Sequence, residues 1–178
     1  AVMYQNTGNI SLAEDQYRGA LKLDPDFSPA RLNLAQMLAV QGRVRDAQSV
    51  LKDGLTRVPA IGEMQYALGL LLAQDGQTKD AVVALQKAAR LLPLRARVQY
   101  NLGLAYQQTG QTKAAEQALL AAARVDESDP DVIYALAAFY FHGQRLKEAR
   151  IWVDKLRQVQ PGDQRLVNLE SALANVPR

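Results

Sequence analysis

The sequence repeats with a period of 34 residues, and this period limits what the chain can fold into more than any other feature. Alanine recurs at this spacing at Ala13, Ala47, Ala81, Ala115 and Ala149. Glycine keeps the same spacing at Gly8, Gly42, Gly76 and Gly110, and proline at Pro25, Pro59, Pro93 and, after one gap, Pro161. A fixed period of about 20 to 50 residues is typical of stacked supersecondary units. It predicts an array of similar units instead of one closed globule.

Each unit has the pattern of two helices. In residues 62–74 the apolar residues have the i, i+4, i+7, i+8 spacing of an amphipathic helix: Met64, Leu68, Leu71 and Leu72. Gly76 is suited to a left-handed helix cap, and Thr78 to the N-cap of a second helix, which Pro93 ends. The sequence predicts an all-α fold of antiparallel helix pairs, with about 13 residues in each helix.

Several residues predict how these helices begin. Ser28-Pro29 and Asp129-Pro130 have the cap-plus-proline pattern of a helix start. Ser11 with Glu14 predicts a capping box. Asp163 is suited to cap a last helix, whose polar outer face is typical of a helix that closes a stack: Gln164, Asn168, Ser171 and Asn175.

Small residues predict close packing inside each pair. We expect Gly69 to lie against Ala81, and Gly103 against Ala115. Gly54 lies inside a helix at a position that alanine occupies in neighbouring units, so we expect it to weaken its unit by about 1 kcal/mol.

We expect a single array over 1–178, with one truncated repeat, four complete repeats and a capping helix: 1–27, 28–61, 62–95, 96–129, 130–163 and 164–178. In register with the later repeats, Ala1 falls about seven residues into a unit. We therefore expect the chain to be a fragment of a longer protein.

Composition excludes several kinds of chemistry. The chain has no cysteine, and His142 is its only histidine, so we expect no metal site, no cofactor and no catalytic triad. No glycine-rich phosphate loop occurs, and we expect no enzymatic activity. The net charge of +3 is spread along the chain, which disfavours nucleic acid as a partner. No apolar run approaches the roughly 18 residues of a membrane span, so we expect a soluble protein, either cytoplasmic or periplasmic.

The repeat resembles the tetratricopeptide repeat (TPR). The 96–129 unit carries the pattern at Tyr100, Leu102, Gly103, Tyr106, Gly110, Ala115, Leu119 and Ala122. The tryptophan of the pattern is replaced in successive units by Arg31, Gln65, Gln99 and Ile133. The resemblance implies a right-handed α-solenoid whose concave groove is lined by the first helix of each unit. It also implies a non-catalytic scaffold that binds a peptide or protein surface in that groove.

On the family's geometry, the groove residues occupy fixed positions of the repeat. A column of tyrosines stands at the fifth position: Tyr66, Tyr100 and Tyr134. Tyrosine is enriched in binding hot spots, so we predict that this column contacts a partner. Asn33 and Asn101 are predicted to bind a peptide backbone through their amides, and Arg97 to meet a partner carboxylate. Weaker candidates are Gln36, Gln107 and Phe141.

Two alternatives stay open. The first is an array that oligomerises through its convex face or its ends, or acts as a spacer. The second is an accessory module of a larger bacterial enzyme or electron-transfer protein. The carboxylate clamp of chaperone-binding members, which needs lysine and asparagine at the fifth and ninth positions, is absent, because the corresponding pairs include Leu32/Gln36 and Tyr66/Leu70. We therefore do not expect a chaperone tail as the ligand.

Overall fold

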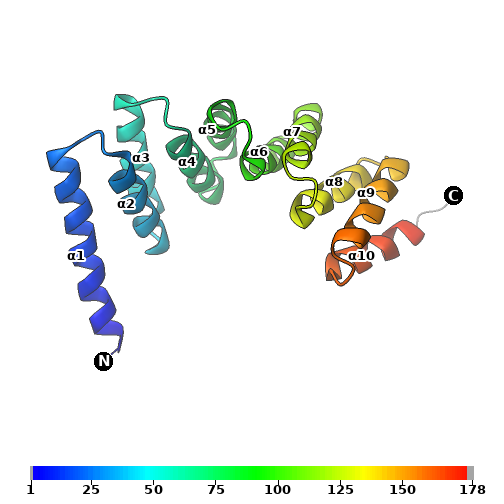
Figure 1. Ribbon diagram of the computed structural model, residues 1–178, viewed down its shortest axis with the longest axis horizontal. Coiled ribbons are helices and arrows are strands. Elements are labelled where there is room, and N and C mark those ends of the chain that lie inside the picture. The colour runs from blue at the N-terminus through cyan, green and yellow to red at the C-terminus, as the bar shows by residue number, and fades with distance from the viewer. Residues whose placement is uncertain (1, 176–178) are drawn as a thin grey trace. The chain divides into compact units, whose positions relative to one another are not determined.

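The computed structural model describes the backbone of residues 2–175 and the side chains of residues 11–175, and in this part of the chain it contains ten α-helices and no strand (Figure 1). The helices are α1 (Val2–Leu23), α2 (Ser28–Val40), α3 (Val44–Arg57), α4 (Gly62–Gln74), α5 (Thr78–Leu91), α6 (Ala96–Gln108), α7 (Thr112–Val125), α8 (Pro130–His142), α9 (Leu146–Val159) and α10 (Gln164–Ala174). They form two compact units, Ala1–Pro93 and Leu94–Arg178. Unit 1 holds α1–α5 and unit 2 holds α6–α10. The predicted all-α fold is confirmed.

Helix pairs are the building blocks of both units. The most extensive packing joins α2 to α3 and α4 to α5 in unit 1, and α6 to α7 and α8 to α9 in unit 2. Neighbouring pairs stack within each unit, because α3 packs on α4 and α7 packs on α8. Helix α1 covers the side of α2, and α10 packs on both α8 and α9.

A left-handed residue closes the turn inside every pair. Gly42, Gly76 and Gly110 have φ of 77°, 75° and 73°, as the sequence predicted. At Gly76 the backbone N–H donates to Ala73 O (3.1 Å), and the N–H of Gln77 donates to Leu72 O (2.9 Å). These two bonds form a Schellman motif, and the same two bonds recur in the other three pairs. The motif reverses the chain within three residues.

The last pair keeps the same turn although its glycine is displaced. Gly143 has an ordinary φ of −77°, and Gln144 takes the left-handed conformation with φ of 58°. Gln144 N–H donates to Phe141 O (3.0 Å), and Arg145 N–H donates to Tyr140 O (2.9 Å). The 34-residue register therefore continues through a residue that has to bear the cost of a left-handed backbone.

The predicted aspartate caps are confirmed, and the hydroxyl caps are wrong. Asp129 Oδ1 accepts from Asp131 N (2.9 Å), and Asp163 Oδ1 accepts from Arg165 N (2.8 Å). Thr78 is the first residue of α5, and its N-cap is Gln77, which makes no side-chain cap bond. The N-cap position is thus taken by the last residue of the three-residue turn, and Thr78 lies one residue too far along to cap α5. Ser28 likewise lies inside α2, and its hydroxyl donates backwards to the backbone oxygen of residue 26 (3.3 Å).

The capping box predicted at Ser11 and Glu14 does not form. Helix α1 runs without interruption from Val2 to Leu23, through Gly8 and Ser11. Ser11 therefore lies inside a continuous helix and cannot serve as an N-cap residue. Glu14 instead accepts hydrogen bonds from Arg18 (2.7 Å) and Arg43 (2.8 Å).

The close contact inside the pairs differs from the prediction by one helical turn. A Cβ atom on Gly69 would lie 2.7 Å from Leu85 Cγ, and one on Gly103 would lie 2.7 Å from Leu119 Cγ. The glycines therefore admit a buried leucine, whereas the alanines named in the prediction are buried next to it. Each unit has its own apolar core of such leucines and alanines.

Gly54 has a role that the sequence analysis missed. The side chain of Arg31, 6% exposed, crosses the place where a Cβ on Gly54 would lie, with Nε 2.7 Å from it. Arg31 Nη2 donates to Pro25 O (2.7 Å), and Nη1 donates to Asp53 Oδ2 (2.6 Å). Gly54 is therefore required by Arg31, and the interpretation of Gly54 as a plain weak point was wrong.

We predict that Gln144→Gly stabilises the protein. Glycine relieves the left-handed strain and should raise the free energy of unfolding by about 0.5–1 kcal/mol. Gly110→Ala, at a site with open space around the added Cβ, should lower it by about 1 kcal/mol. Urea unfolding followed by circular dichroism measures both, and a destabilised Gln144→Gly variant would contradict the strain argument.

We also predict opposite effects for two helical glycines. Gly54→Ala should lower the free energy of unfolding by about 1–3 kcal/mol, because the methyl group overlaps Arg31. Gly19→Ala in α1, with no atom within 4 Å of the added Cβ, should raise it by about 0.5–1 kcal/mol. In an Arg31→Gln background, the loss of unfolding free energy caused by Gly54→Ala should be smaller by at least about half, and a double-mutant cycle measures this difference. An unchanged loss would mean that the clash is not with Arg31.

Candidate functional site

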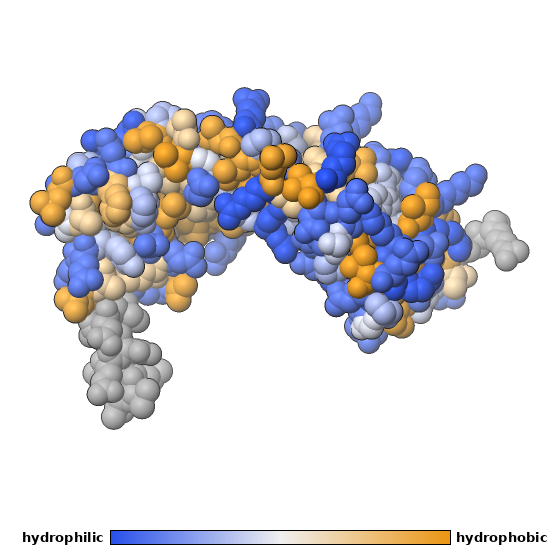
Figure 2. Space-filling model, in the orientation of Figure 1, coloured by the Kyte–Doolittle hydropathy of each residue, from blue (hydrophilic) through white to orange (hydrophobic). Residues whose placement is uncertain are grey.

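Surface hydrophobicity alone does not locate a site. On the face shown in Figure 2, apolar surface lies in several separate patches divided by hydrophilic side chains. The large exposed apolar residues are scattered over both units, and include Leu23, Val40, Leu94 and Ile151. The candidate site therefore has to be found from the geometry of the side chains.

A groove of about 500 Å³ lies between α2 and α4 in unit 1. Its apolar lining is Leu32, Ala35, Ala39, Ala67, Leu70 and Leu71. Its polar lining consists of three primary amides, Asn33, Gln36 and Gln74. These nine residues define the α2–α4 groove. No charged side chain is among them, which leaves it apolar with amide groups.

Helical periodicity brings these residues together. Leu32, Gln36 and Ala39 follow one another at i, i+4 and i+7 along α2, and Ala67, Leu71 and Gln74 do the same along α4. Since α2 and α4 pack against each other, the two stripes face a common hollow. The floor is partly open to solvent, as Leu70 is 38% exposed.

Two of the predicted site residues line this groove and one does not. Asn33 and Gln36 are both exposed on it. Tyr66 is half-buried, makes contacts of its own and is not among the lining residues. The sequence analysis missed Ala67, Leu70 and Gln74, although Leu70 occupies the ninth repeat position and was considered only for a carboxylate clamp. The repeat register could have identified these three residues from the sequence.

In unit 2 the predicted tyrosines are covered by arginines. The guanidinium of Arg97 lies 5.2 Å from the ring centroid of Tyr100, and that of Arg165 lies 4.8 Å from Tyr134. Both are cation–π contacts. Both tyrosines are half-buried. Burial raises the pKa of Tyr100 above its ordinary value.

Arg97 and Arg165 also share a carboxylate. Asp131 Oδ2 accepts from Arg97 Nη1 (3.2 Å), and Asp131 Oδ1 accepts from Arg165 Nη1 (2.9 Å). The three residues occupy the same position of successive repeats, so they form a ladder of alternating charge along unit 2. The hydrogen bond from Arg165 is the main cause that lowers the pKa of Asp131, and Arg97 adds to it.

The other predicted residues of unit 2 differ in their surroundings. Asn101 is half-buried and has contacts, and Gln107 is exposed. Phe141 packs beside the core, and its ring centroid lies 5.6 Å from that of His142 in an edge-on arrangement. Of the predicted residues in this unit, Arg97 and Tyr100 contact each other directly.

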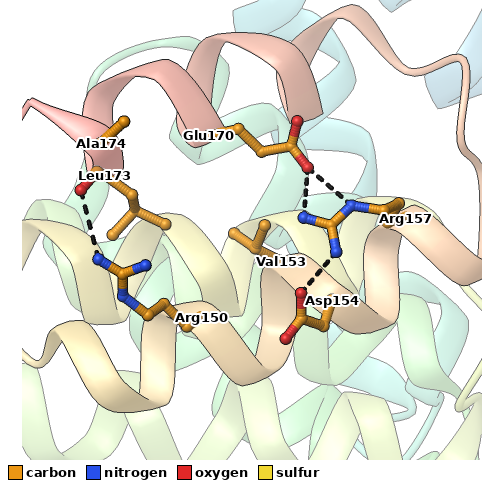
Figure 3. Close-up of a pocket in the computed structure, with 7 residues that line it drawn as sticks. All are labelled: Arg150, Val153, Asp154, Arg157, Glu170, Leu173 and Ala174. Carbon is orange, nitrogen blue, oxygen red and sulfur yellow. Dashed lines mark hydrogen bonds and ion pairs between the residues drawn. The ribbon is translucent and has the colours of Figure 1, made fainter.

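A hollow of about 380 Å³ between α9 and α10 is lined by ion-paired side chains (Figure 3). Arg157 bridges the two helices' acidic groups, donating to Glu170 Oε1 (2.6 Å) and to Asp154 Oδ1 (2.7 Å). Glu170 has the repeat position of buried leucines in the four preceding first helices, Leu34, Leu68, Leu102 and Leu136. In α10 a charged side chain therefore replaces the apolar one at this repeat position, and the role of α10 as a capping helix stays a prediction.

Metal-ligating side chains do not cluster in the described part of the chain. Within residues 11–175 no group of three or more His, Cys, Asp or Glu side chains could hold a metal ion. Among the described helices, none is both long and apolar enough to cross a bilayer.

Antiparallel helix pairs in a fixed 34-residue register define the class of α-solenoid repeat proteins. Family models described as tetratricopeptide repeat match residues 7–70 and 100–163, and one described as TPR repeat matches residues 69–110. The chain belongs to the tetratricopeptide repeat family. Proteins of this family typically mediate protein–protein interactions and are generally not catalysts.

Solved structures agree on the fold. YrrB, described as a TPR protein with an unusual peptide-binding site, is 21% identical with a TM-score of 0.80, and the match covers 95% of this chain and 87% of the YrrB chain. Pseudomonas aeruginosa pilF is 24% identical with a TM-score of 0.80, and the match covers 97% of this chain and 79% of the pilF chain. MamA from Desulfovibrio magneticus RS-1 is 21% identical with a TM-score of 0.78, covering 90% of each. Among curated proteins, no sequence matches the chain significantly.

We predict that the charge ladder stabilises unit 2 only while Asp131 is ionised. Asp131→Asn should lower the free energy of unfolding at pH 7 by about 1 kcal/mol, a loss limited by solvent screening of this 38% exposed carboxylate. Because the folded pKa is depressed, this stabilisation is present above the ordinary aspartate pKa and is lost as pH falls through the folded value. Asp80→Asn, another exposed first-turn aspartate, serves as the control. Urea unfolding at pH 7 and about pH 2 should show a difference specific to Asp131 that disappears in acid.

Proposed function

We propose that the chain is a non-catalytic protein–protein interaction scaffold that binds an extended, uncharged peptide segment in the α2–α4 groove. The observation that carries this proposal is the lining of that groove: an apolar floor, three amides and no charge. The family's usual activity supports the general function, and the side chains of the groove support the class of ligand.

The chemistry of the lining fits a peptide. Leu32 and Leu70 offer apolar surface whose removal from water favours binding of an apolar side chain. The amides of Asn33, Gln36 and Gln74 each carry donors and an acceptor, which match the N–H and C=O groups of an extended backbone. A charged ligand residue would lose its hydration in this groove and find no opposite charge there.

Other predicted residues extend the proposal. Tyr66 in unit 1 and Tyr100 and Tyr134 in unit 2 remain proposed partner contacts, with Asn101 and Arg97 as polar contacts. A partner carboxylate at Arg97 would compete with Asp131, so this contact is proposed to be weaker than the amide contacts of unit 1. Gln107 and Phe141 are proposed as weaker partner contacts.

The test begins with peptides selected by phage display on the intact chain, and measures their affinity by fluorescence anisotropy. We predict that the selected sequences are poor in charged residues and that Leu70→Glu weakens their binding at least about tenfold, because it puts an unpaired charge in the groove floor. Val83→Glu is the matched control, since Val83 is a 50% exposed apolar residue on α5 that does not line the groove.

Circular dichroism establishes that both variants stay helical. Equal binding by the wild-type chain and Leu70→Glu would remove the groove as the binding site. Selection of mainly charged peptides would refute the proposed ligand class, even if the Leu70→Glu variant no longer binds them.

A further inference from the structure

A second cavity of unit 1 lies among α1, α2 and α3 and has a different chemistry from the α2–α4 groove. Its volume is about 380 Å³. Its lining is basic and apolar: Arg18, Leu21, Lys22, Pro25, Arg31, Leu34, Ser49, Val50, Asp53 and Arg57. These residues define the α1–α3 cavity. Four of them are cations and one is a carboxylate.

The inner end of the cavity holds the buried Arg31. Its guanidinium donates to Pro25 O (2.7 Å), Val50 O (3.1 Å) and Asp53 Oδ2 (2.6 Å). An arginine buried to this extent is costly unless its charge is matched. Asp53 matches it from the solvent side, because that carboxylate side chain is 65% exposed.

The positive charge of Arg31 is not needed to hold the helix start. Gln65 has the same repeat position and donates to Pro59 O (3.3 Å), the counterpart of the bond from Arg31 to Pro25. A neutral amide therefore makes the structural contact in the next repeat. The chain nevertheless keeps an arginine at position 31 and a glycine at position 54 to admit it.

Cations also line the mouth of the cavity. Arg18 is paired with Glu14 (2.7 Å), and Arg57 with Asp26 (2.7 Å). Lys22 lies one turn beyond Arg18 on α1, and no carboxylate among the described residues forms an ion pair with it. Four cations thus meet three carboxylates around a cavity whose walls include Leu21 and Leu34.

The corresponding depression of unit 2 keeps only part of this chemistry. It lies at the same repeat positions, is about 180 Å³ in volume, and is lined by Leu120, Ala123, Arg124, Glu127, Trp152 and Lys155. Arg124 takes the place of Lys22, but Leu120 takes the place of Arg18, and the fully buried Ile133 takes the place of Arg31. Of these two cavities, only the one in unit 1 combines four lining cations with a buried arginine.

We propose that the α1–α3 cavity binds a small organic anion, with a phosphate or carboxylate group held by Lys22, Arg57 and Arg31 and a compact apolar part against Leu21 and Leu34. Arginine matches the oxygens of such groups by its planar fork, and lysine adds a mobile charge at the mouth. The cavity size suits a ligand with one ring or a short chain. This site is separate from the α2–α4 groove in its lining residues and does not depend on the proposed peptide binding.

The test uses phenyl phosphate and benzoate as anionic probes and benzyl alcohol as the neutral probe, each titrated into the intact chain at low salt. Amide chemical shifts in two-dimensional NMR report both affinity and location. We expect saturable binding of at least one anion, with shifts centred on Arg18, Lys22, Val50 and Arg57, and no saturation by benzyl alcohol. Benzoate and phenyl phosphate together tell which anionic group the cavity prefers.

Variants separate this site from unspecific attraction of anions. Lys22→Gln removes a cation without breaking an ion pair, and should weaken anion binding at least about fivefold. Lys87→Gln on α5 removes an exposed lysine that does not line the cavity, and should leave the affinity unchanged. The proposal is overturned if neither anion saturates, if benzyl alcohol binds equally well, if both variants have the same effect, or if Lys22→Gln binds as the wild-type chain does.

Discussion

The two backbone hydrogen bonds around a left-handed residue are the constraint on which the helix pairs depend. They turn the chain within three residues, so the second helix has to run back along the first. The antiparallel arrangement then brings Leu85 against Gly69 and Leu119 against Gly103. Because the turn is set by backbone geometry, it survives the displacement of the last glycine, and Gln144 adopts the strained conformation instead.

Substitutions at the tryptophan position of the repeat show how one framework acquires different local chemistry. Gln65 makes a neutral contact to a proline carbonyl, Ile133 is fully buried, and Arg31 carries a charge into unit 1. Arginine at position 31 requires a glycine at position 54, since any Cβ there would overlap the arginine side chain. Two residues 23 positions apart in sequence are therefore coupled by packing.

The two hollows of unit 1 differ in chemistry. The α2–α4 groove carries amides and apolar side chains, which is why we propose an uncharged peptide as its ligand, whereas the α1–α3 cavity carries cations. In unit 2 the first helices present tyrosines covered by arginines, and the charges of Arg97 and Arg165 are already balanced by Asp131. Similar helices thus present distinct surfaces because only their exposed positions vary.

Part of the candidate site could be predicted from the sequence. Asn33 and Gln36 were assigned to a groove by their repeat positions, and both line the α2–α4 groove, whereas their contact with a partner stays a prediction. Tyr66 was placed by the same rule, yet it does not line the groove, because a repeat position gives the direction of a side chain and not its final contacts. Arg97 was expected to face a partner, but its nearest carboxylate comes from the following repeat at Asp131. Contacts between repeats depend on rotamers and on neighbouring side chains, which a single unit's pattern does not contain.

The sequence by itself determined the period, the helix pairs, the left-handed turns at Gly42, Gly76 and Gly110 and the aspartate caps, because these depend on local backbone preferences and apolar periodicity. Tertiary structure alone decided that Thr78 caps nothing, that Gly54 makes room for Arg31, and that cations gather in the α1–α3 cavity. Those outcomes depend on which side chains meet across different helices, and this meeting is fixed only when the helices have packed.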